Sequence, residues 1–426
     1  MPAELCRSNT VTVGGGTHTW GDLADASAAA LAGRVEPAAE RLAFLPSSPE
    51  GPFAAAAFLA SRGTDGLILP ASRATETMRS LLAAGGFTIV EDGAEPAQPP
   101  TAPEVQPGRV AIFTSGTTGD PKLLHHSWQS LDTMGHITGM EPRCWLLPYA
   151  AGTYAWYQLV TLSLFKEGQT LVAADPRDTE AFFEAGAAAG ANAMSSTPTF
   201  WRFALARLDA GRLRALDLRQ ISLGGEIVDP EILDHLRALF PEARVNHIYA
   251  STEVGACLSV GDGRAGFPVE WLDSDRHRNF QFRIADGTLR VRSAFASTSV
   301  RRDEDGWVDT GDRVEVRGDR VYFVGRVEGS MINVGGSKAY PADVERVLLG
   351  HPAVRWCRVH ARRAPLVGYL AAAEVVADGT PAELETALTR WCGERLPDFA
   401  VPRIWTFLEE IPMAATLKSA RMTPDG

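Results

Sequence analysis

The feature that most constrains the fold of this chain is a regular alternation of short apolar runs with alanine-rich stretches between Asp22 and Val90. The runs RLAFL, GLIL and FTIV predict buried strands, and the stretches beside them predict helices near 22–33, 52–61 and 72–83. Strands that alternate with helices in this way form a parallel sheet with crossover helices. Further along, DPEILDHLRALF predicts another helix at 229–240. The sequence therefore predicts a large N-terminal α/β domain.

Two later regions have a different pattern. From residue 280, FQFRIADGTLRVRS and GDRVEVRGDRVYFVG alternate polar and apolar residues around DG and GD pairs, which predicts a β-rich subdomain. From about residue 329 the chain contains strand and helix patterns of its own, so we expect a separate small α+β domain there. The proline-rich stretch 91–108 predicts an exposed connection between two subdomains.

Charge and composition exclude several classes of protein. The 426 residues carry 41 basic and 52 acidic side chains, a net charge of -11, so a nucleic acid or an anionic membrane would be repelled, although a local cationic pocket for a nucleotide stays possible. The five cysteines are scattered without a CxxC pair, which favours neither a disulfide framework nor a zinc site. No stretch approaches the roughly 18 apolar residues of a membrane helix. We expect a cytoplasmic protein that acts on small molecules, with neither nucleic acid nor membrane as a partner.

A loop rich in glycine and hydroxyl side chains follows the apolar run VAIF. Its free backbone N–H groups, hydroxyls and lysine suit the neutralisation and hydrogen bonding of a polyphosphate. The loop does not meet the pattern of a P-loop NTPase, because Lys122 follows Pro121. The predicted phosphate-binding residues are Thr114, Ser115, Gly116, Thr117, Thr118, Gly119 and Lys122.

This loop resembles the phosphate-binding signature of the adenylate-forming superfamily, which contains acyl-CoA synthetases, nonribosomal adenylation domains and luciferases. Further stretches resemble other motifs of that superfamily in the same order along the chain. They are SLGGE at 222–226, YASTE at 249–253, WVDTGD at 307–312, GR at 325–326 with INVGGSK at 332–338, and the segment from Ile411 to Arg421. On these motifs the chain is identified as a member, of a compact type that resembles ligases of bacterial secondary metabolism.

The resemblance implies an ATP site. Tyr249 would stack on adenine, and Asp312 would accept hydrogen bonds from the ribose hydroxyls. Arg326 would reach ribose or phosphate. Glu253 would hold Mg²⁺ on the phosphates, because a hard cation prefers carboxylate oxygen. The other residues implied on the nucleotide side are Gly224, Gly225, Glu226, Ala250 and Ser251.

The resemblance also implies the catalytic residues Lys418, Glu253 and Thr252. The Lys418 ammonium would stabilise the negative charge that develops when an acid oxygen attacks the α-phosphorus. The surrounding LKSAR departs from the superfamily by having Leu417 where glycine is usual.

A hinge between two domains is implied as well. We place an N-terminal adenylation core at 1–327, a hinge at Glu328 and Gly329, and a mobile C-terminal domain at 330–426. In relatives that form thioesters the C-terminal domain turns after adenylation, so the hinge favours a second, thioester-forming step.

The order of the motifs places the acid-binding wall in LPYAAGTYAWY and in SSTP. Its aromatic residues favour a flat, aromatic or conjugated ligand, but aromatic side chains at helical spacing also pack in protein cores, and the sequence leaves both interpretations open. The predicted pocket residues are Tyr149, Tyr154, Trp156, Tyr157, Ser196 and Thr197.

These motifs predict a ligase that uses ATP and Mg²⁺ to convert a small, aromatic or unsaturated acid to acyl-AMP. The acyl group would then pass to CoA or to the phosphopantetheine of an acyl carrier protein. One alternative is a diazotase on the same fold, which activates nitrite for attack by an aryl amine; the compact N-terminal part and the altered LKSAR loop favour it. A second alternative is a non-catalytic nucleotide-binding protein, against which the joint presence of Glu253, Asp312, Arg326 and Lys418 argues.

Overall fold

The computed structural model describes residues 4–100, 104–115, 121–274, 278–326, 331–334, 337–364 and 368–412. Their strands form a large sheet, an N-terminal sheet, an antiparallel sheet and a C-terminal sheet. The predicted fold class is confirmed: a large α/β part with parallel strands and a β-rich subdomain precedes a small α+β domain. Among the described helices, none has both the length and the apolar character that a bilayer crossing requires.

The large sheet is parallel through its centre and carries one antiparallel strand at each edge. Its strands run in the order β13 (Gly255–Val260), β12 (Arg244–Ser251), β11 (Gln220–Gly224), β10 (Ala193–Ser196), β8 (Arg143–Leu147), β9 (Gln169–Ala173), β1 (Thr10–Val13) and β2 (Gly16–Thr19).

Helices cover both faces of the large sheet. Along β8, Trp145 and Leu147 belong to one core cluster and Leu146 to another, which is the alternation of a strand buried on both sides. The helices connected with this sheet are α5 (Tyr154–Phe165), α6 (Thr179–Ala188), α7 (Pro198–Arg207), α8 (Ala210–Arg214) and α9 (Pro230–Leu239). The helix predicted at 229–240 corresponds to α9, whose Asp229 side chain caps it by accepting from the N–H of Ile232.

The N-terminal sheet contains the strands predicted from RLAFL, GLIL and FTIV. It runs in the order β5 (Phe87–Glu91), β3 (Arg41–Leu45), β4 (Gly66–Ile68), β6 (Arg109–Ser115) and β7 (Pro121–Ser127). Its helices are α1 (Trp20–Leu31), α2 (Gly51–Arg62), η1 (Ala71–Arg73), α3 (Glu76–Ala84) and α4 (Trp128–Leu131). The helix expected near 72–83 begins only at Glu76, because Thr75 caps α3 through the N–H of Met78.

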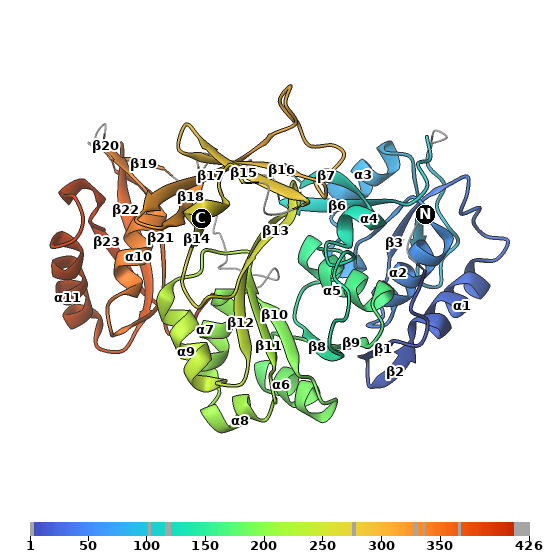
Figure 1. The fold of residues 1–426 in the computed structure, drawn as a ribbon, viewed down its shortest axis with the longest axis horizontal. Helices are drawn as coiled ribbons and strands as arrows, with labels where there is room; N and C mark the ends of the chain where they lie inside the picture. Colours follow the sequence, from blue (N-terminus) through green and yellow to red (C-terminus); the bar gives the residue numbers. More distant parts are fainter. Residues whose placement is uncertain are drawn as a thin grey trace.

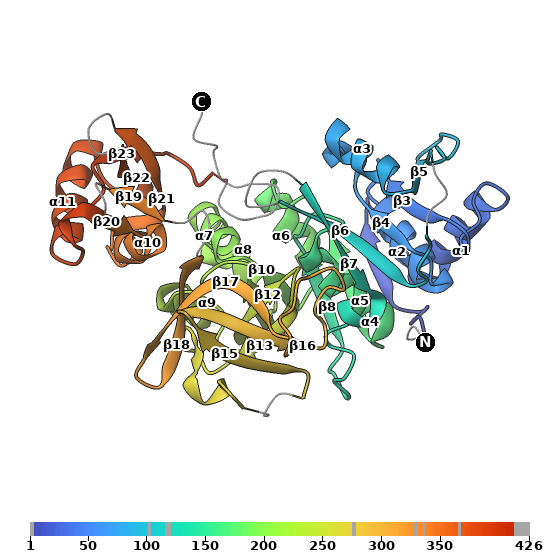
Figure 2. The same cartoon turned by 90° about the horizontal axis from the view of Figure 1, so that it is seen from above.

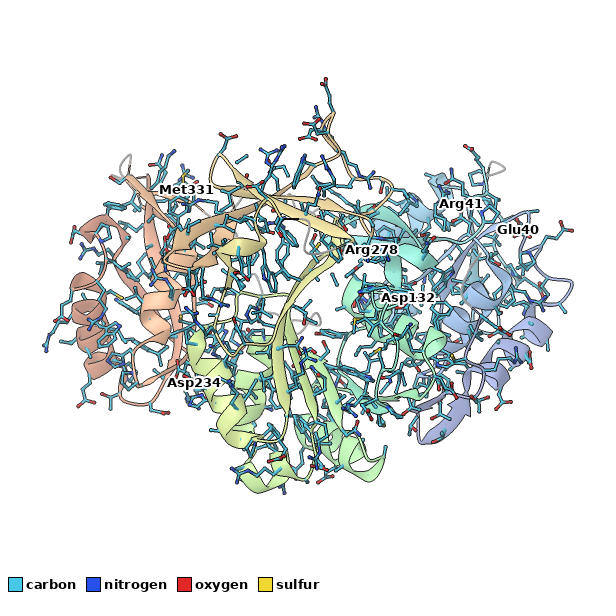
Figure 3. All side chains as sticks on the ribbon, viewed as in Figure 1. Glu40, Arg41, Asp132, Asp234, Arg278 and Met331 are labelled. Atoms are coloured by element: carbon cyan, nitrogen blue, oxygen red, sulfur yellow. The ribbon has the colours of Figure 1, made fainter. Side chains whose placement is uncertain are left out.

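A buried carboxylate holds the first residues of three strands of this sheet together. Asp65, directly before β4, is fully buried, and its Oδ2 lies 2.8 Å from Nη2 of Arg109 and 3.2 Å from Nε of Arg41. Figure 3 labels Arg41 on this sheet. Separating these side chains would leave a charge buried without a partner, which is strongly destabilising. The cluster therefore holds the starts of β3, β4 and β6 close together.

The antiparallel sheet contains the predicted β-rich segments. It runs in the order β14 (Phe267–Pro268), β18 (Arg320–Arg326), β17 (Val308–Arg317), β16 (Thr288–Ser293) and β15 (Phe280–Ala285), with the short helix η2 (Val269–Trp271) beside it. Asp286 and Gly287 join β15 to β16 with positive φ angles of 53° and 71°, as a two-residue hairpin turn requires.

The C-terminal sheet runs in the order β20 (Ser337–Ala339), β19 (Ile332–Val334), β22 (Gly368–Ala377) and β21 (Val354–Ala364), and β23 (Ile404–Phe407) pairs with β22. Its helices are α10 (Pro341–Leu349), α11 (Pro381–Gly393) and η3 (Asp398–Ala400). Figures 1 and 2 both place this domain at one end of the long axis and helices α1 to α3 at the other.

Among the described residues, the C-terminal domain contacts the rest of the molecule at two places. Phe203 of α7 packs in a small cluster with Trp356 and Val376, and Arg207 of α7 forms an ion pair with Glu410. On the antiparallel sheet, the Arg313 guanidinium lies 3.8 Å from the centre of the Tyr340 ring. Within the described residues, the C-terminal domain therefore contacts both helix α7 and the antiparallel sheet.

Candidate functional site

Several predicted residues lie at the carboxyl ends of neighbouring strands of the large sheet. In the parallel pair of β11 and β12, Gly224 is opposite Ile248, so the segments after both strands leave the sheet at the same edge. Ligands of open α/β sheets bind in the crevice outside the carboxyl ends of the strands. The SLGGE and YASTE motifs therefore share one edge, where a nucleotide is expected.

Tyr249 connects the large sheet with the antiparallel sheet. Its hydroxyl donates to Oδ2 of Asp312 at 2.6 Å, and its ring stacks on Phe323 with 4.6 Å between ring centres and 17° between planes. Burial raises the pKa of Tyr249, and the neighbouring Asp312 carboxylate raises it further. The phenol therefore stays protonated and donates its hydrogen bond to Asp312. Phe323 covers one face of the ring that was predicted to stack on adenine.

Asp312 is held from a second side by Arg326. The two residues are opposite one another on β17 and β18, with 3.0 Å between Arg326 Nε and Asp312 Oδ1. Arg326 also donates through Nη2 to the carbonyl oxygen of Thr310 at 2.8 Å. The structure thus brings Tyr249, Asp312 and Arg326 together, with the Asp312 carboxylate in a fixed position.

The turn Thr252–Glu253 is fixed through its backbone. Nε2 of His126 lies 2.7 Å from the carbonyl oxygen of Thr252, and the N–H of Ser297 donates to the carbonyl oxygen of Glu253 at 2.9 Å. For the Glu253 side chain, no ion pair or hydrogen bond occurs within the part of the chain that the structure describes. A carboxylate fixed by its backbone and without a cationic partner fits the single protein ligand with which Mg²⁺ commonly binds beside phosphates.

His126 is a neutral imidazole at physiological pH. Burial lowers its pKa to about 4, and only 1% of the side chain is exposed. With a proton on Nε2 it donates to Thr252, so Nδ1 accepts from the Ser130 hydroxyl at 3.1 Å. From its place after the phosphate loop, His126 could be expected to contact phosphate or solvent, whereas the structure buries it against the Thr252 turn.

The phosphate loop joins two antiparallel strands. Thr114 on β6 is opposite Lys122 on β7, and the Thr114 hydroxyl donates weakly to the Lys122 carbonyl oxygen at 3.4 Å. Strand β7 was not predicted, since PKLLHHS lacks a clear alternation. Ser115 ends β6, and the other predicted loop residues, Gly116, Thr117, Thr118 and Gly119, lie outside the described residues.

Glu226 ties the SLGGE segment to helix α7. Its carboxylate accepts from the N–H and from the hydroxyl of Thr199, each at 3.0 Å. Thr197, one of the predicted pocket residues, caps the same helix by accepting from the N–H of Phe200 at 3.1 Å. Both side chains are therefore engaged in holding the start of α7, and Gly225 before Glu226 has a left-handed φ of 80°.

The predicted pocket residues do not form one wall. On β10, Ser196 is fully buried and shares a face with Met194, whereas Ser195 lies on the other face with its Oγ 3.2 Å from the Tyr149 hydroxyl. Neighbouring residues of a strand point to opposite faces, and the sequence alone did not say which serine faces Tyr149.

The aromatic residues of α5 also separate. Tyr154 accepts at its hydroxyl from the N–H of Ala256 at 3.1 Å, and Tyr157 packs edge-on against Trp128 with no exposed surface. Trp156 is nearly fully buried and reaches the wall of a cleft. Helix α5 is apolar on all sides, so core packing accounts for Tyr157, while Tyr149 and Trp156 remain candidates for ligand contact.

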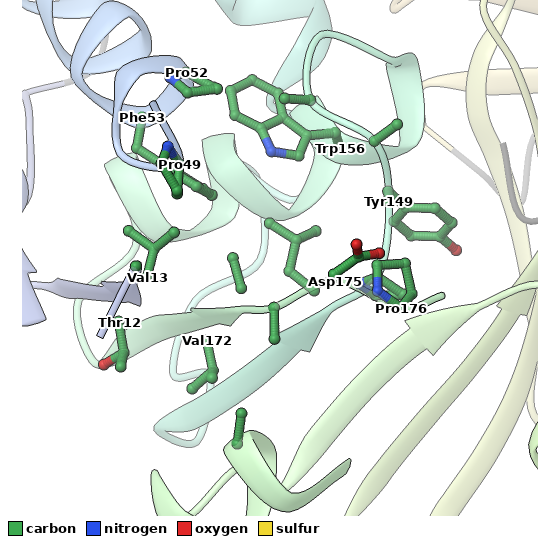
Figure 4. Close-up of a pocket in the computed structure, with 18 of the residues that line it drawn as sticks. Thr12, Val13, Pro49, Pro52, Phe53, Tyr149, Trp156, Val172, Asp175 and Pro176 are labelled. Atoms are coloured by element: carbon green, nitrogen blue, oxygen red, sulfur yellow. The ribbon is translucent and has the colours of Figure 1, made fainter. Parts of the chain in front are cut away.

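A cleft of about 1150 Å³ lies between the N-terminal sheet and the large sheet. Figure 4 shows Val13, Phe53, Trp156 and Val172 on its walls and Tyr149 at one side. The backbone can approach closely here only because Gly152 has no side chain: a Cβ at this residue would lie 2.0 Å from the carbonyl oxygen of Ile68.

The catalytic Lys418 and the hinge residues Glu328 and Gly329 also lie outside the described residues. Their roles stay predictions. Within the described ranges, no group of three or more metal-ligating side chains occurs.

Comparison with known proteins identifies the family. Residues 54–279 match the AMP-binding enzyme family, and residues 343–418 match the C-terminal domain of AMP-binding enzymes. The 2-succinylbenzoate–CoA ligase of Bacillus mycoides (strain KBAB4) is 27% identical over 345 residues, which cover 73% of this chain and 68% of the relative. The mitochondrial acyl-coenzyme A synthetase ACSM4 of Rattus norvegicus is 25% identical over 354 residues, which cover 72% of this chain and 59% of the relative.

Solved structures share the fold across almost the whole chain. The anthranilate CoA ligase AuaEII in complex with anthranoyl-AMP has a TM-score of 0.74 at 18% identity, covering 97% of this chain and 93% of that structure. The amide bond synthetase McbA from Marinactinospora thermotolerans has a TM-score of 0.68 at 21% identity, covering 98% and 95%. At these identities the likeness concerns the fold.

Proposed function

We propose that this chain, which belongs to the AMP-binding enzyme family, is an adenylate-forming acid–CoA ligase. It activates a small aromatic carboxylic acid with ATP as the acyl-AMP and then transfers the acyl group to the thiol of CoA. Relatives named for 2-succinylbenzoate and anthranilate support an aromatic acid. An acyl carrier protein is the second thiol donor that we propose to test.

The observation that carries the proposal is the arrangement of Tyr249, Asp312 and Arg326 beside the Thr252–Glu253 turn. Asp312 presents a carboxylate that two hydrogen-bonding partners orient before any ligand binds. The lone pairs that remain on its oxygens can accept from the two hydroxyls of a ribose. Binding at such a preorganised group costs little further ordering.

In the first step an oxygen of the acid attacks the α-phosphorus, and the bond to pyrophosphate breaks. Pyrophosphate leaves with the electron pair, and acyl-AMP forms. We assign Asp312 and Tyr249 to holding the nucleoside, Glu253 to holding Mg²⁺, and Lys418 to stabilising charge on the attacking oxygen and the α-phosphate. When bound, Mg²⁺ supplies neutralisation of the phosphate charge. In the second step a thiolate attacks the acyl carbon, and AMP leaves.

The test measures pyrophosphate and AMP release from ATP and Mg²⁺ with a panel of aryl and unsaturated acids. Each acid is supplied alone, with CoA, or with a phosphopantetheinylated carrier protein, and products are identified by mass spectrometry. We expect acyl-AMP from one acid alone and its thioester when a thiol is present. Turnover only with nitrite and an aryl amine would replace the proposal with N–N bond formation, and ATP binding without AMP in any mixture would indicate a non-catalytic protein.

Lys418→Ala separates the two steps within one variant. We expect adenylation to fall at least about 100-fold, because the developing charge loses its cation. Supplied acyl-AMP bypasses that step, so thioester formation from acyl-AMP and CoA should continue and serves as the folding control. Unchanged pyrophosphate release would remove Lys418 from the mechanism.

A further inference from the structure

The cleft between the two α/β sheets is separate from the nucleotide side. It is bordered by the turn between β1 and β2, the start of α2, the segment around η1, and the chain after β8 and β9. None of Tyr249, Glu253, Asp312 and Arg326 lines it. A volume of about 1150 Å³ is large enough for an organic molecule of the size that protein pockets usually enclose.

The walls of the cleft are mainly apolar. Phe53 of α2 and Trp156 of α5 form one side, and Val13 of β1 and Val172 of β9 belong to neighbouring strands of the large sheet (Figure 4). On the α6 side the lining residues are small, among them Ala185 and Ala188, so they leave the space open. Such a surface suits an aromatic or aliphatic body.

Arg73 is the unpaired cation of this lining. Asp175 and Arg177 also line the cleft, but three hydrogen bonds of 2.6 to 3.1 Å join their side chains and neutralise both charges. Arg73 donates through Nη1 to the carbonyl oxygen of Ala151 at 2.7 Å and forms no ion pair with any carboxylate of the described residues. Burial without a compensating carboxylate lowers its pKa, yet a guanidinium keeps its charge.

Tyr149 lies where the cleft meets the nucleotide side. Its ring lines the cleft, and its hydroxyl contacts Ser195 on β10, the strand beside β11 and the SLGGE segment. A ligand in the cleft would therefore lie one aromatic ring away from the segment where the nucleotide is expected.

We propose that this cleft is a second ligand site that takes an organic anion with an apolar body, and that Arg73 binds the anionic group. A guanidinium offers several N–H donors to a carboxylate, sulfonate or phosphate, and one of its nitrogens is already oriented by Ala151. Two molecules of the proposed reaction have this chemistry, the acid and CoA. Assigning either one rests on the proposed function, whereas binding in the cleft does not.

The experiment titrates the protein with 8-anilinonaphthalene-1-sulfonate, a fluorescent organic anion, with saturating ATP and Mg²⁺ occupying the nucleotide side. We expect Arg73→Gln to weaken binding at least about ten-fold, the usual effect of losing a charge-assisted hydrogen bond. Ala188→Trp should also weaken binding, because the indole would fill the cleft from the exposed end of α6. Benzoate and CoA are then added as separate competitors, and the one that displaces the probe identifies the source of the natural anion.

Arg62→Gln is the matched control, because Arg62 is exposed at the far end of α2 and is not part of the cleft. We expect it to bind the probe within about two-fold of the original protein. Thermal melting of each variant checks the fold. Unchanged affinity in Arg73→Gln overturns the proposal, and so does loss of probe binding on addition of ATP, because the probe would then occupy the nucleotide side. Neither result depends on turnover, so a failed acid panel leaves this test intact.

Discussion

The two sides of Tyr149 are built on different physical principles. On the nucleotide side, polar groups are already bonded to one another, as in the chain from Tyr249 through Asp312 to Arg326. In the cleft the walls are apolar, and Arg73 has no carboxylate partner among the described residues. The polar groups of the nucleotide side are oriented before a ligand binds, whereas the cleft offers apolar surface and the single positive charge of Arg73.

This difference indicates how a single fold can bind one constant substrate, ATP, beside a second substrate, the acid, that varies between relatives. Oriented donors and acceptors select one chemical group and lose little free energy to reorganisation when it binds. Apolar walls with small side chains change shape with a few substitutions and leave the polar network untouched. We therefore expect substitutions on the nucleotide side to change ATP use strongly, and substitutions near Tyr149 to change acid use mildly.

The largest effect is expected from Asp312→Asn. The amide cannot pair with Arg326, which leaves a half-buried guanidinium without its carboxylate, and it accepts fewer hydrogen bonds from ribose. We expect kcat/KM for ATP to fall about 100-fold in a pyrophosphate-release assay. Asp319→Asn in the same sheet breaks only an exposed pair with Arg264 and should stay within about two-fold. Equal losses in both variants would mean that general electrostatics, and not the oriented carboxylate, matters.

An effect of intermediate size is expected on the pH dependence of the unfolding free energy, through the buried His126 that bonds to Thr252. The folded pKa of about 4 lies below the ordinary 6.5, so between these values the unfolded chain binds more protons and stability rises with pH. The contribution is complete above pH 6.5 and is lost as pH falls towards 4, at up to about 1.4 kcal/mol per pH unit. His126→Gln cannot titrate, so urea unfolding followed from pH 4.5 to 7 should show a flatter dependence.

The matched control for this prediction is His235→Gln, since His235 is exposed on α9. It should leave the pH dependence of the unfolding free energy unchanged. His125, whose pKa is also lowered to about 4 by burial and by Arg109 and Arg41, remains in both variants. If His126→Gln keeps the original slope, the His126 imidazole of the original protein is already protonated in the folded state at the pH values tested, and the prediction is wrong.

The smallest effect is expected from Tyr149→Phe. It removes one hydroxyl whose contact with Ser195 is 3.2 Å long, and a hydrogen bond of this kind contributes about 1 kcal/mol. We expect KM for the acid to rise about five-fold while KM for ATP is unchanged. Tyr369→Phe, at an exposed tyrosine of the C-terminal domain, provides the control. A large change in KM for ATP would contradict the separation of the two sides.

Sequence reasoning predicted the fold where periodicity and turn chemistry agree. The helix at 229–240 has an aspartate cap and a regular apolar face, and the DG pair at 286–287 demands the positive φ angles that the structure shows. The hairpin of β1 and β2 was missed, since the short segments beside the glycines at 14–16 give little pattern to detect.

Motifs in the sequence named residues that the structure brings together, but they could not place residues whose surroundings depend on packing. Tyr249, Asp312 and Arg326 come from motifs, and the structure brings them into contact. Tyr157 and Trp156 are adjacent in an apolar helix, so only the packing shows that one is core and the other reaches the cleft. Arg73 belongs to no motif, and its proposed role arises because it forms no ion pair among the described residues.

The contact of α7 with the C-terminal domain has a consequence for protein engineering. Phe203 and Arg207 of this helix meet the C-terminal domain, and the contact of Arg313 with Tyr340 joins that domain to the antiparallel sheet, so a graft of the domain from a relative must match both surfaces. Glu226 of the SLGGE segment bonds to Thr199 at the start of the same helix, so a poorly matched graft that shifts α7 would also displace this segment. Chimeras are therefore best joined with α7 and its new partner taken from the same parent.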